Sequence, residues 1–214
     1  ELDITIQSGI SEIDGIKATT YDFSKVSESE IFALDLSVEQ AQKDAILEAK
    51  NSHNSVGGVA LINVKNAPIG LGEPLYFKLD SQIANAMMSI NAVKAVEIGD
   101  GILASKVKGY DNNDQIRKDG FKTNHSGGIL GGISNGDDIN VKVYFKATPS
   151  IFIEQETIDI HNDEVNCQLK GRHDPCVAVR GSVVSESMMA LVLADMVLLN
   201  MSSKMENVKK VYSK

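Results

Sequence analysis

The sequence predicts an α+β protein in which a helical layer lies between antiparallel β-sheets. Residues 139–146 alternate strictly between apolar and polar side chains, which is typical of a half-buried strand. Apolar positions on either side of the polar pair Asn162-Asp163 predict a hairpin over residues 158–169. A helix from Ser185 to about Ser202 is apolar on almost every side. Because such a helix has no polar face, we expect protein to cover it on both sides.

The remaining elements of the first half follow from local patterns. The first residues alternate in polarity and predict a half-buried strand. Ser37, with Gln40 at the capping-box position, predicts the start of a helix that ends near Lys50. The nearly continuous apolar run over residues 59–64 has the length of a buried strand.

A second helix, a short strand and a polar excursion are expected next. Asp80 or Ser81 caps this helix, and its buried face is expected to consist of Ile83, Ala86, Met87 and Ile90. Residues 93–98 predict a strand, and residues 104–124 are too polar for anything but a surface segment. No linker or repeat divides the chain, so we expect residues 1–214 to form a single domain.

Charge and composition exclude several classes of function. The 214 residues carry 29 acidic and 21 basic side chains, which gives a formal net charge of −8. A nucleic-acid interface needs clustered Lys and Arg, so none is expected. Cys167 and Cys176 form no C-x-x-C pair, and the four histidines have no metal-ligand spacing, so no metal site is expected. The longest apolar run, residues 188–201, is too short and too interrupted to cross a membrane.

Three segments, residues 127–136, 146–150 and 171–176, carry side chains or backbone groups suited to binding or catalysis. The glycines of residues 127–136 let backbone N–H groups approach a phosphate or a flat ring, although a glycine-rich turn that leads into a strand is the favoured alternative. The loop from Lys146 to Ser150 offers an ammonium group and hydroxyls to a phosphate, although a solvated loop is favoured two to one. A fourth segment, residues 88–94, is weak, because Asn at a helix end is more often a cap than a ligand.

Residues 171–176 place Arg172, His173 and Asp174 between a glycine and a proline. In an extended chain, Arg172 and Asp174 point to the same face and His173 to the other. Arg172 and Asp174 are therefore the pair suited to catalysis: the guanidinium can bind an anionic substrate, and the carboxylate can accept or donate a proton. A surface ion pair is an equally good interpretation.

Taken together, these segments resemble the chorismate synthase family. The matching stretches occur in the family's order, from about Leu36 to Asn200, and comprise residues 55–58, 70–74, 89–94 with 97–101, 124–136, 146–151 and 171–176. The resemblance implies the β-α-β sandwich of that family, of which this chain holds only part. It also implies conversion of 5-enolpyruvylshikimate-3-phosphate to chorismate by 1,4-elimination of phosphate, with reduced FMN and without net redox change.

The resemblance assigns roles residue by residue. The implied flavin contacts are Asn91, Ala92, Gly131, Lys146, Ala147, Thr148, Pro149, Ser150 and Arg172. Arg172 is also expected beside the anionic substrate. Asp174 matches the carboxylate that helps to deprotonate the reactive flavin nitrogen or relays the substrate proton.

Two departures from the family pattern are evident. The family loop usually has the sequence Lys-Pro-Thr-Ser-Ser, whereas Lys-Ala-Thr-Pro-Ser stands at residues 146–150, and Pro149 cannot donate a backbone N–H. The family's amino-terminal histidine motif, its substrate-binding arginines and its Arg-Ser-Ser-Ala-Arg-Glu segment have no counterpart in the chain. Neither His125 nor His173 is assigned as the general acid for phosphate loss.

We therefore expect the carboxy-terminal portion of a chorismate synthase, poorly active by itself. The family further implies a cytoplasmic homotetramer that acts on a small molecule, with NADPH as a possible flavin reductant. A non-catalytic flavin- or nucleotide-binding module is the alternative. A structural or interaction protein is a third interpretation.

Overall fold

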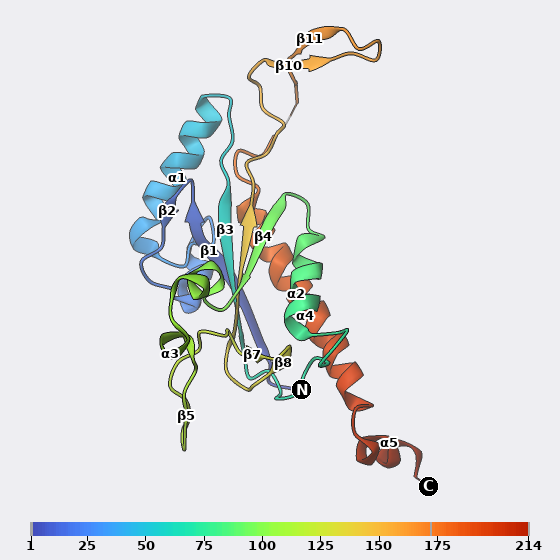
Figure 1. Cartoon of the computed structure of the whole chain (residues 1–214). Coiled ribbons are helices and arrows are strands. Elements are labelled where there is room, and N and C mark those ends of the chain that lie inside the picture. Colours follow the sequence, from blue (N-terminus) through green and yellow to red (C-terminus); the bar gives the residue numbers. More distant parts are fainter. Residues whose placement is uncertain (1, 172, 214) are drawn as a thin grey trace.

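A five-stranded antiparallel sheet lies at the centre of the structure, a computed structural model that describes residues 2–171 and 173–213. The strand order is β2-β1-β3-β9-β4 (Figure 1). The strands are β1 (Thr5–Ile13), β2 (Ile16–Lys17), β3 (Gly58–Lys65), β4 (Val93–Ile98) and β9 (Ile139–Phe145). The strands expected at the start of the chain and over residues 59–64, 93–98 and 139–146 are confirmed.

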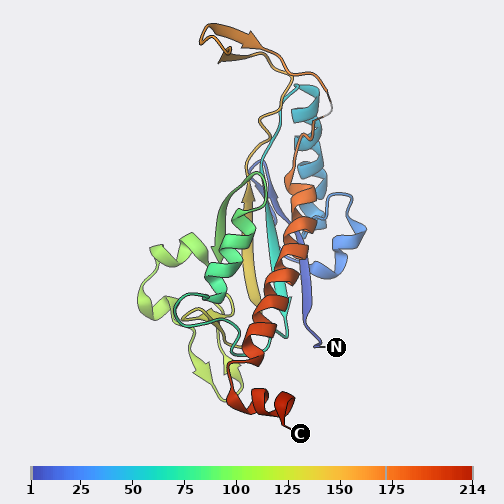
Figure 2. The same cartoon turned by 90° about the vertical axis from the view of Figure 1, so that its right-hand side faces the viewer.

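Two helices, α2 (Leu79–Met88) and α4 (Ala178–Met201), cover one face of this sheet (Figure 2). The strand register aligns Ile10, Ala60 and Val143 across β1, β3 and β9, so their side chains share that face. They join one buried cluster with helix residues that include Ile83, Met87, Met189, Leu193 and Met196. Each such side chain contributes about 1.5–3 kcal/mol when fully buried. The α+β class is confirmed.

The pattern of burial explains why two strands were easy to recognise. In β3 every residue but the last is buried, because the strand lies between β1 and β9 in the middle of the sheet. Its sequence is therefore apolar from Val59 to Val64 except for the buried Asn63. In β9 buried and half-buried residues alternate, which matches the alternation of apolar and polar residues in the sequence.

Helix α1 (Leu36–Asn51) packs on β1 and β2 and starts at a different cap from the one expected. Asp35, not Ser37, is the N-cap, and its carboxylate accepts hydrogen bonds from the Ser37 N–H at 2.9 Å and the Thr19 N–H at 2.8 Å. The Ser37 hydroxyl donates to the same carboxylate. These donors, foremost the Ser37 and Thr19 side chains, hold the pKa of Asp35 well below its ordinary value of 3.8.

The predicted starts of the other two helices were also wrong. Helix α4 begins at Ala178, and Ser185 lies buried within it, where its hydroxyl donates to the Gly181 carbonyl at 2.7 Å. A serine whose hydroxyl bonds back to the preceding turn does not need to stand at a cap. Helix α2 begins after Lys78 rather than after Asp80 or Ser81.

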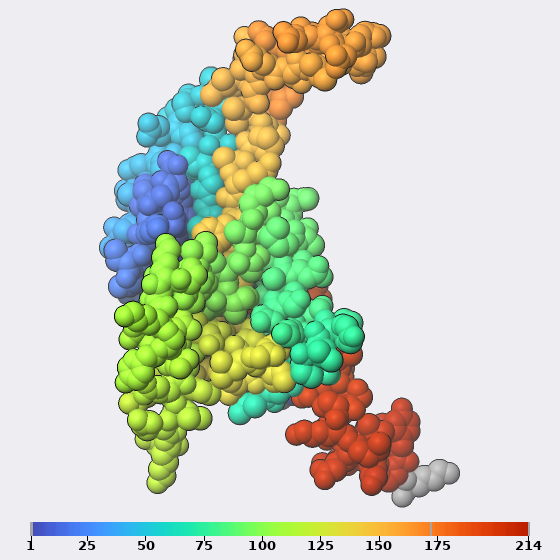
Figure 3. Space-filling view, viewed as in Figure 1, coloured from blue at the N-terminus to red at the C-terminus, as the bar shows by residue number. Residues whose placement is uncertain are grey.

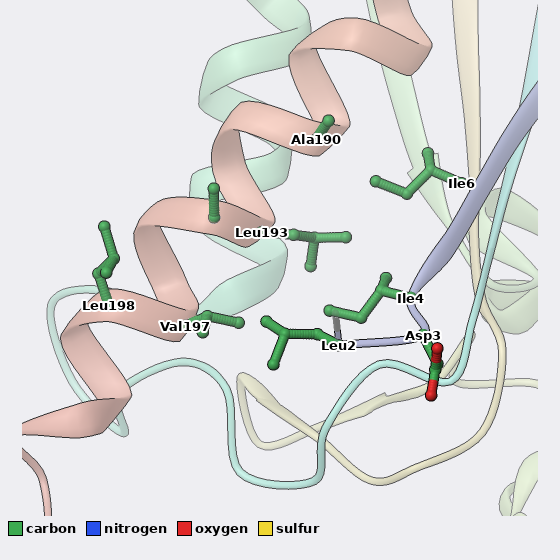
Figure 4. A pocket seen from close by; sticks show the side chains of 9 residues that line it. Leu2, Asp3, Ile4, Ile6, Ala190, Leu193, Val197 and Leu198 are labelled. Carbon is green, nitrogen blue, oxygen red and sulfur yellow. The ribbon is translucent and has the colours of Figure 1, made fainter.

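The outer side of α4 carries exposed apolar side chains, among them Val184, Leu191 and Leu198. Beside it, an open apolar hollow of about 630 Å³ lies between the start of β1 and the second half of the helix (Figure 4). In the described residues the central sheet packs on one side of α4, and none of the three two-stranded sheets covers the outer side of this helix. By length and composition alone α4 is long enough for a membrane span, but core helices of soluble proteins satisfy the same criterion.

Smaller elements project from the central layers. A hairpin, β10 (Gln155–Ile158) with β11 (Glu164–Cys167), extends from one end and confirms the turn at Asn162-Asp163, and α5 (Met205–Tyr212) lies at the opposite end (Figure 3). The expected polar excursion holds η2 (Gly101–Lys106), α3 (Gly109–Asn112), β5 (Ile116–Arg117) and β6 (Gly120–Phe121). The other short elements are η1 (Phe23–Glu28), β7 (Ile129–Leu130) and β8 (Ile133–Ser134).

The close approach of α4 to β9 predicts the effect of one substitution. A Cβ atom at Gly181 would collide with the buried ring of Phe145, so either the helix or the ring must shift. We expect Gly181→Ala to lower the free energy of unfolding by about 1–3 kcal/mol in urea denaturation. Ser187→Ala, on the exposed side of the same helix, is the control, and equal stability of the two variants would contradict the packing described.

The cap of α1 predicts a pH dependence. Because folding lowers the pKa of Asp35, its ionised carboxylate stabilises the fold at neutral pH, and this contribution is lost as the pH falls below 3.8 toward the folded-state pKa. Asp35→Asn should therefore lower the melting temperature at pH 7 and have a smaller effect at pH 2, where part of this contribution is already lost. Asp44→Asn, an exposed change in the same helix, controls for loss of a negative charge. A deficit that does not change with pH would be inconsistent with this account.

Candidate functional site

Two of the predicted flavin-contact segments meet at one end of the central sheet. β4 and β9 pair antiparallel, so residues 91–92, which precede β4, lie beside residues 146–150, which follow β9. The Lys146 N–H donates to the Ala92 carbonyl at 2.9 Å and closes this end of the ladder. All seven residues are exposed or half-buried, so this end of the sheet is open to solvent.

A third segment, residues 53–57, joins this loop to the segment that carries Asp174. The Ser55 hydroxyl donates to the Thr148 carbonyl at 2.6 Å. The Val56 N–H donates to the Pro175 carbonyl at 2.8 Å. Both bonds link residues about 90 or more positions apart in the chain, so the fold creates this cluster.

Asp174 lies at the same end of the sheet, just before α4. Its carboxylate pairs with Arg180 in the first turns of that helix, with 3.1 Å between the Arg180 Nη2 and Asp174 Oδ1 atoms. The neighbouring His173 ring packs edge-on against Phe152 at a centroid distance of 4.8 Å. Arg172, which we expected beside the substrate, lies outside the described residues.

Two polar atoms in this cluster are buried without a hydrogen-bond partner, among the residues that the structure describes. They are the Thr148 Oγ1 and the His173 Nε2 atoms. Buried polar atoms in native proteins usually have partners, so such atoms beside an accessible loop are suited to a ligand. With the Lys146 ammonium and the Asn91 amide, the loop offers several hydrogen-bond donors, which fits a phosphate or the acceptor-rich edge of a flavin. The residues present therefore fit FMN.

Gly131 is far from this cluster within one copy of the chain. It lies in the turn between β7 and β8, at the other end of β9, and seven strand residues span roughly 20 Å. This hairpin is fixed to the start of α2, because the Leu79 N–H donates to the Gly132 carbonyl at 2.7 Å. The glycine-rich segment thus forms a turn that leads toward β9, and its contact with a ligand stays a prediction.

The apolar hollow beside α4 contains none of the predicted site residues. Asp3 is the one charged residue in its lining, and the rest is aliphatic. A carboxylate beside aliphatic groups does not suit an anionic ligand. The end of the sheet is therefore the better candidate site.

Two residues of the cluster were not singled out from the sequence. Ser55 stands in the Ser-Val-Gly-Gly stretch that contributed to the resemblance, but nothing in the sequence indicates its bond to Thr148. Arg180 is six positions from Asp174, which would place the two side chains on different faces of a helix and about 20 Å apart along a strand. The turn before α4 brings the two together.

Comparison with known proteins gives a consistent result. The sequence profile of the family described as chorismate synthase matches residues 1–198. A curated chorismate synthase from Aliarcobacter butzleri is 85% identical over all 214 residues, and one from Sulfurimonas denitrificans is 62% identical over the same length. The chain also superposes on a crystal structure of a chorismate synthase with a TM-score of 0.77 at 30% identity, over 97% of this chain and 61% of that one.

The chain spans about 60% of the length of these curated relatives. The match nevertheless includes the sheet, α2, all but the last three residues of α4 and all three segments of the candidate site. The chain therefore belongs to the chorismate synthase family.

Proposed function

We propose that these residues form the flavin-side part of a chorismate synthase, a carbon–oxygen lyase of the shikimate pathway of aromatic amino-acid biosynthesis. The reaction removes phosphate from 5-enolpyruvylshikimate-3-phosphate by 1,4-elimination and yields chorismate. The observation that supports this most directly is the convergence of residues 91–92, residues 146–150 and Asp174 at one end of the sheet, in a chain that belongs to this family.

Reduced FMN is the proposed cofactor. When bound, it supplies electron density as phosphate departs and accepts it back as the ring hydrogen is removed. Lys146 would neutralise the flavin phosphate or the ring edge as a point charge, and the hydroxyls of Thr148 and Ser150 would donate hydrogen bonds. Asn91 and Ala92 would border the same ligand from the start of β4, where Ala92 has a positive φ of 71°.

Asp174 is the proposed proton-handling group. Arg180 holds its carboxylate at 3.1 Å and thereby fixes its orientation, while the side chain stays about 30% exposed and so accessible to a ligand. A positioned carboxylate in this place can accept a proton from the flavin's reactive nitrogen or relay one from the substrate. Arg172, two residues earlier, is the proposed partner of the anionic substrate.

We also propose a cytoplasmic homotetramer, with NADPH as a possible source of electrons for the flavin. The position of Gly131 supports an oligomer. Within one copy, Gly131 and the candidate site lie at opposite ends of β9, so a second copy would have to supply the Gly131 contact to the flavin. The acidic net charge of −8 is compatible with this site, since Lys146 and Arg172 would localise the positive charge that an anionic substrate requires.

The first test compares this 214-residue chain with the complete Aliarcobacter butzleri relative under anaerobic conditions, with reduced FMN and substrate. Because the chain spans 60% of that relative, we expect its turnover to be lower by at least about 100-fold, as when a single group that stabilises charge in a transition state is lost. Equal turnover would refute the view that further residues are required.

The second test separates the enzyme from a non-catalytic flavin-binding module. Asp174→Asn, made in the complete relative, should lower turnover by about 100-fold or more while the Kd for FMN changes less than about twofold. Asp111→Asn, an exposed change in α3, is the matched control. A pure binding module would show the same flavin affinity in all three proteins and no turnover in any of them.

A further inference from the structure

Residues 53–57, which connect α1 to β3, touch both halves of the candidate site. The His53 carbonyl accepts a hydrogen bond from the Phe152 N–H at 3.1 Å. The Ser55 hydroxyl donates to the Thr148 carbonyl, and the Val56 N–H donates to the Pro175 carbonyl. One short segment therefore bonds to the loop after β9 and to the residue next to Asp174.

The two halves of the site are not hydrogen-bonded to each other directly. Within residues 2–171 and 173–213, no hydrogen bond joins residues 146–150 to residues 173–176. Close to both segments, the rings of Phe152 and His173 make an edge-on contact. The distance between the proposed flavin-contact loop and the proposed proton-handling group thus depends on residues 53–57.

This connecting segment has little freedom to move. A Cβ atom at Gly57 would lie 2.7 Å from the Phe145 carbonyl oxygen, so the backbone here packs directly against the end of β9. The Gly57 carbonyl accepts a hydrogen bond from the Asp14 N–H at 3.2 Å, and the Asn54 side chain accepts one from the Ser55 N–H at 2.9 Å. Ser55 is therefore presented to Thr148 from a fixed support.

We propose that Ser55 is a positioning residue for flavin binding, an inference that rests on the proposed function. By binding the Thr148 carbonyl, the Ser55 hydroxyl fixes the middle of the loop and holds the buried Thr148 Oγ1 atom, which has no hydrogen-bond partner in the described residues, in one position beside the candidate site. Through Val56 and Pro175, the same segment sets the loop at a constant distance from Asp174.

The test uses Ser55→Ala, the conservative Ser55→Thr and the control Ser52→Ala in the complete Aliarcobacter butzleri relative. Ser52 is three residues away, and its hydroxyl bonds only to the Glu48 and Ala49 carbonyls of α1. Flavin fluorescence should show an FMN Kd about three- to tenfold higher for Ser55→Ala. It should change less than twofold for Ser55→Thr and Ser52→Ala.

A second measurement does not depend on flavin. In the 214-residue chain without ligand, amide hydrogen exchange of residues 147–152 should become faster in Ser55→Ala and stay unchanged in Ser52→Ala. If the unmodified relative fails to bind FMN, the proposed function itself is overturned. If it binds FMN and Ser55→Ala binds equally well, or if exchange in the loop is unaltered, the role of Ser55 is overturned while the proposed function stands.

Discussion

The pairing of β3 and β4 on either side of β9 determines where the candidate site lies. Gly58, at the start of β3, and Val93, at the start of β4, both stand opposite Phe145 at the end of β9. Because the strands are antiparallel, the segments before β3, before β4 and after β9 emerge at the same end of the sheet. A one-residue slip in either pair would turn the buried faces outward, so the buried core that fixes this register also fixes the site.

The sequence correctly predicted the strands whose pattern of apolar residues reflects burial. It misplaced the start of a helix where two neighbouring residues are equally suited to be the N-cap. The continuous run of β3 and the alternation of β9 were recognised because burial on two faces or on one leaves different patterns. The cap of α1 was misplaced because Asp35 and Ser37 are both good N-cap residues, and the donors from the distant Thr19 that help to favour Asp35 are brought to it only by the fold. Within the site, the contact between residues 91–92 and 146–150 follows from pairing of β4 with β9, whereas the Asp174–Arg180 pair depends on the path of the chain between Pro175 and the start of α4, which the sequence does not specify.

The long helix α4 is covered by the sheet on one side, whereas its composition predicts cover on both sides. Its apolar sequence indicated cover on both sides, and the structure provides the sheet on one side, with Met189, Leu193 and Met196 in the core. On the other side Leu191 and Leu198 are each 66% exposed. The curated relatives are longer than this chain, so the composition of α4 is consistent with a helix selected to lie between two layers.

The packing of α4 on β1 also has a consequence for synthesis of the protein. The Ser8 N–H donates to the Glu186 carboxylate across 178 positions of the chain, so the first strand meets its covering helix only when nearly the whole segment has left the ribosome. Until then α2 is the only one of the two covering helices that is available to the apolar face of the growing sheet. Contacts of such sequence separation slow folding and prolong the exposure of strand edges. We therefore expect nascent chains of this protein to be most prone to aggregation before α4 is complete.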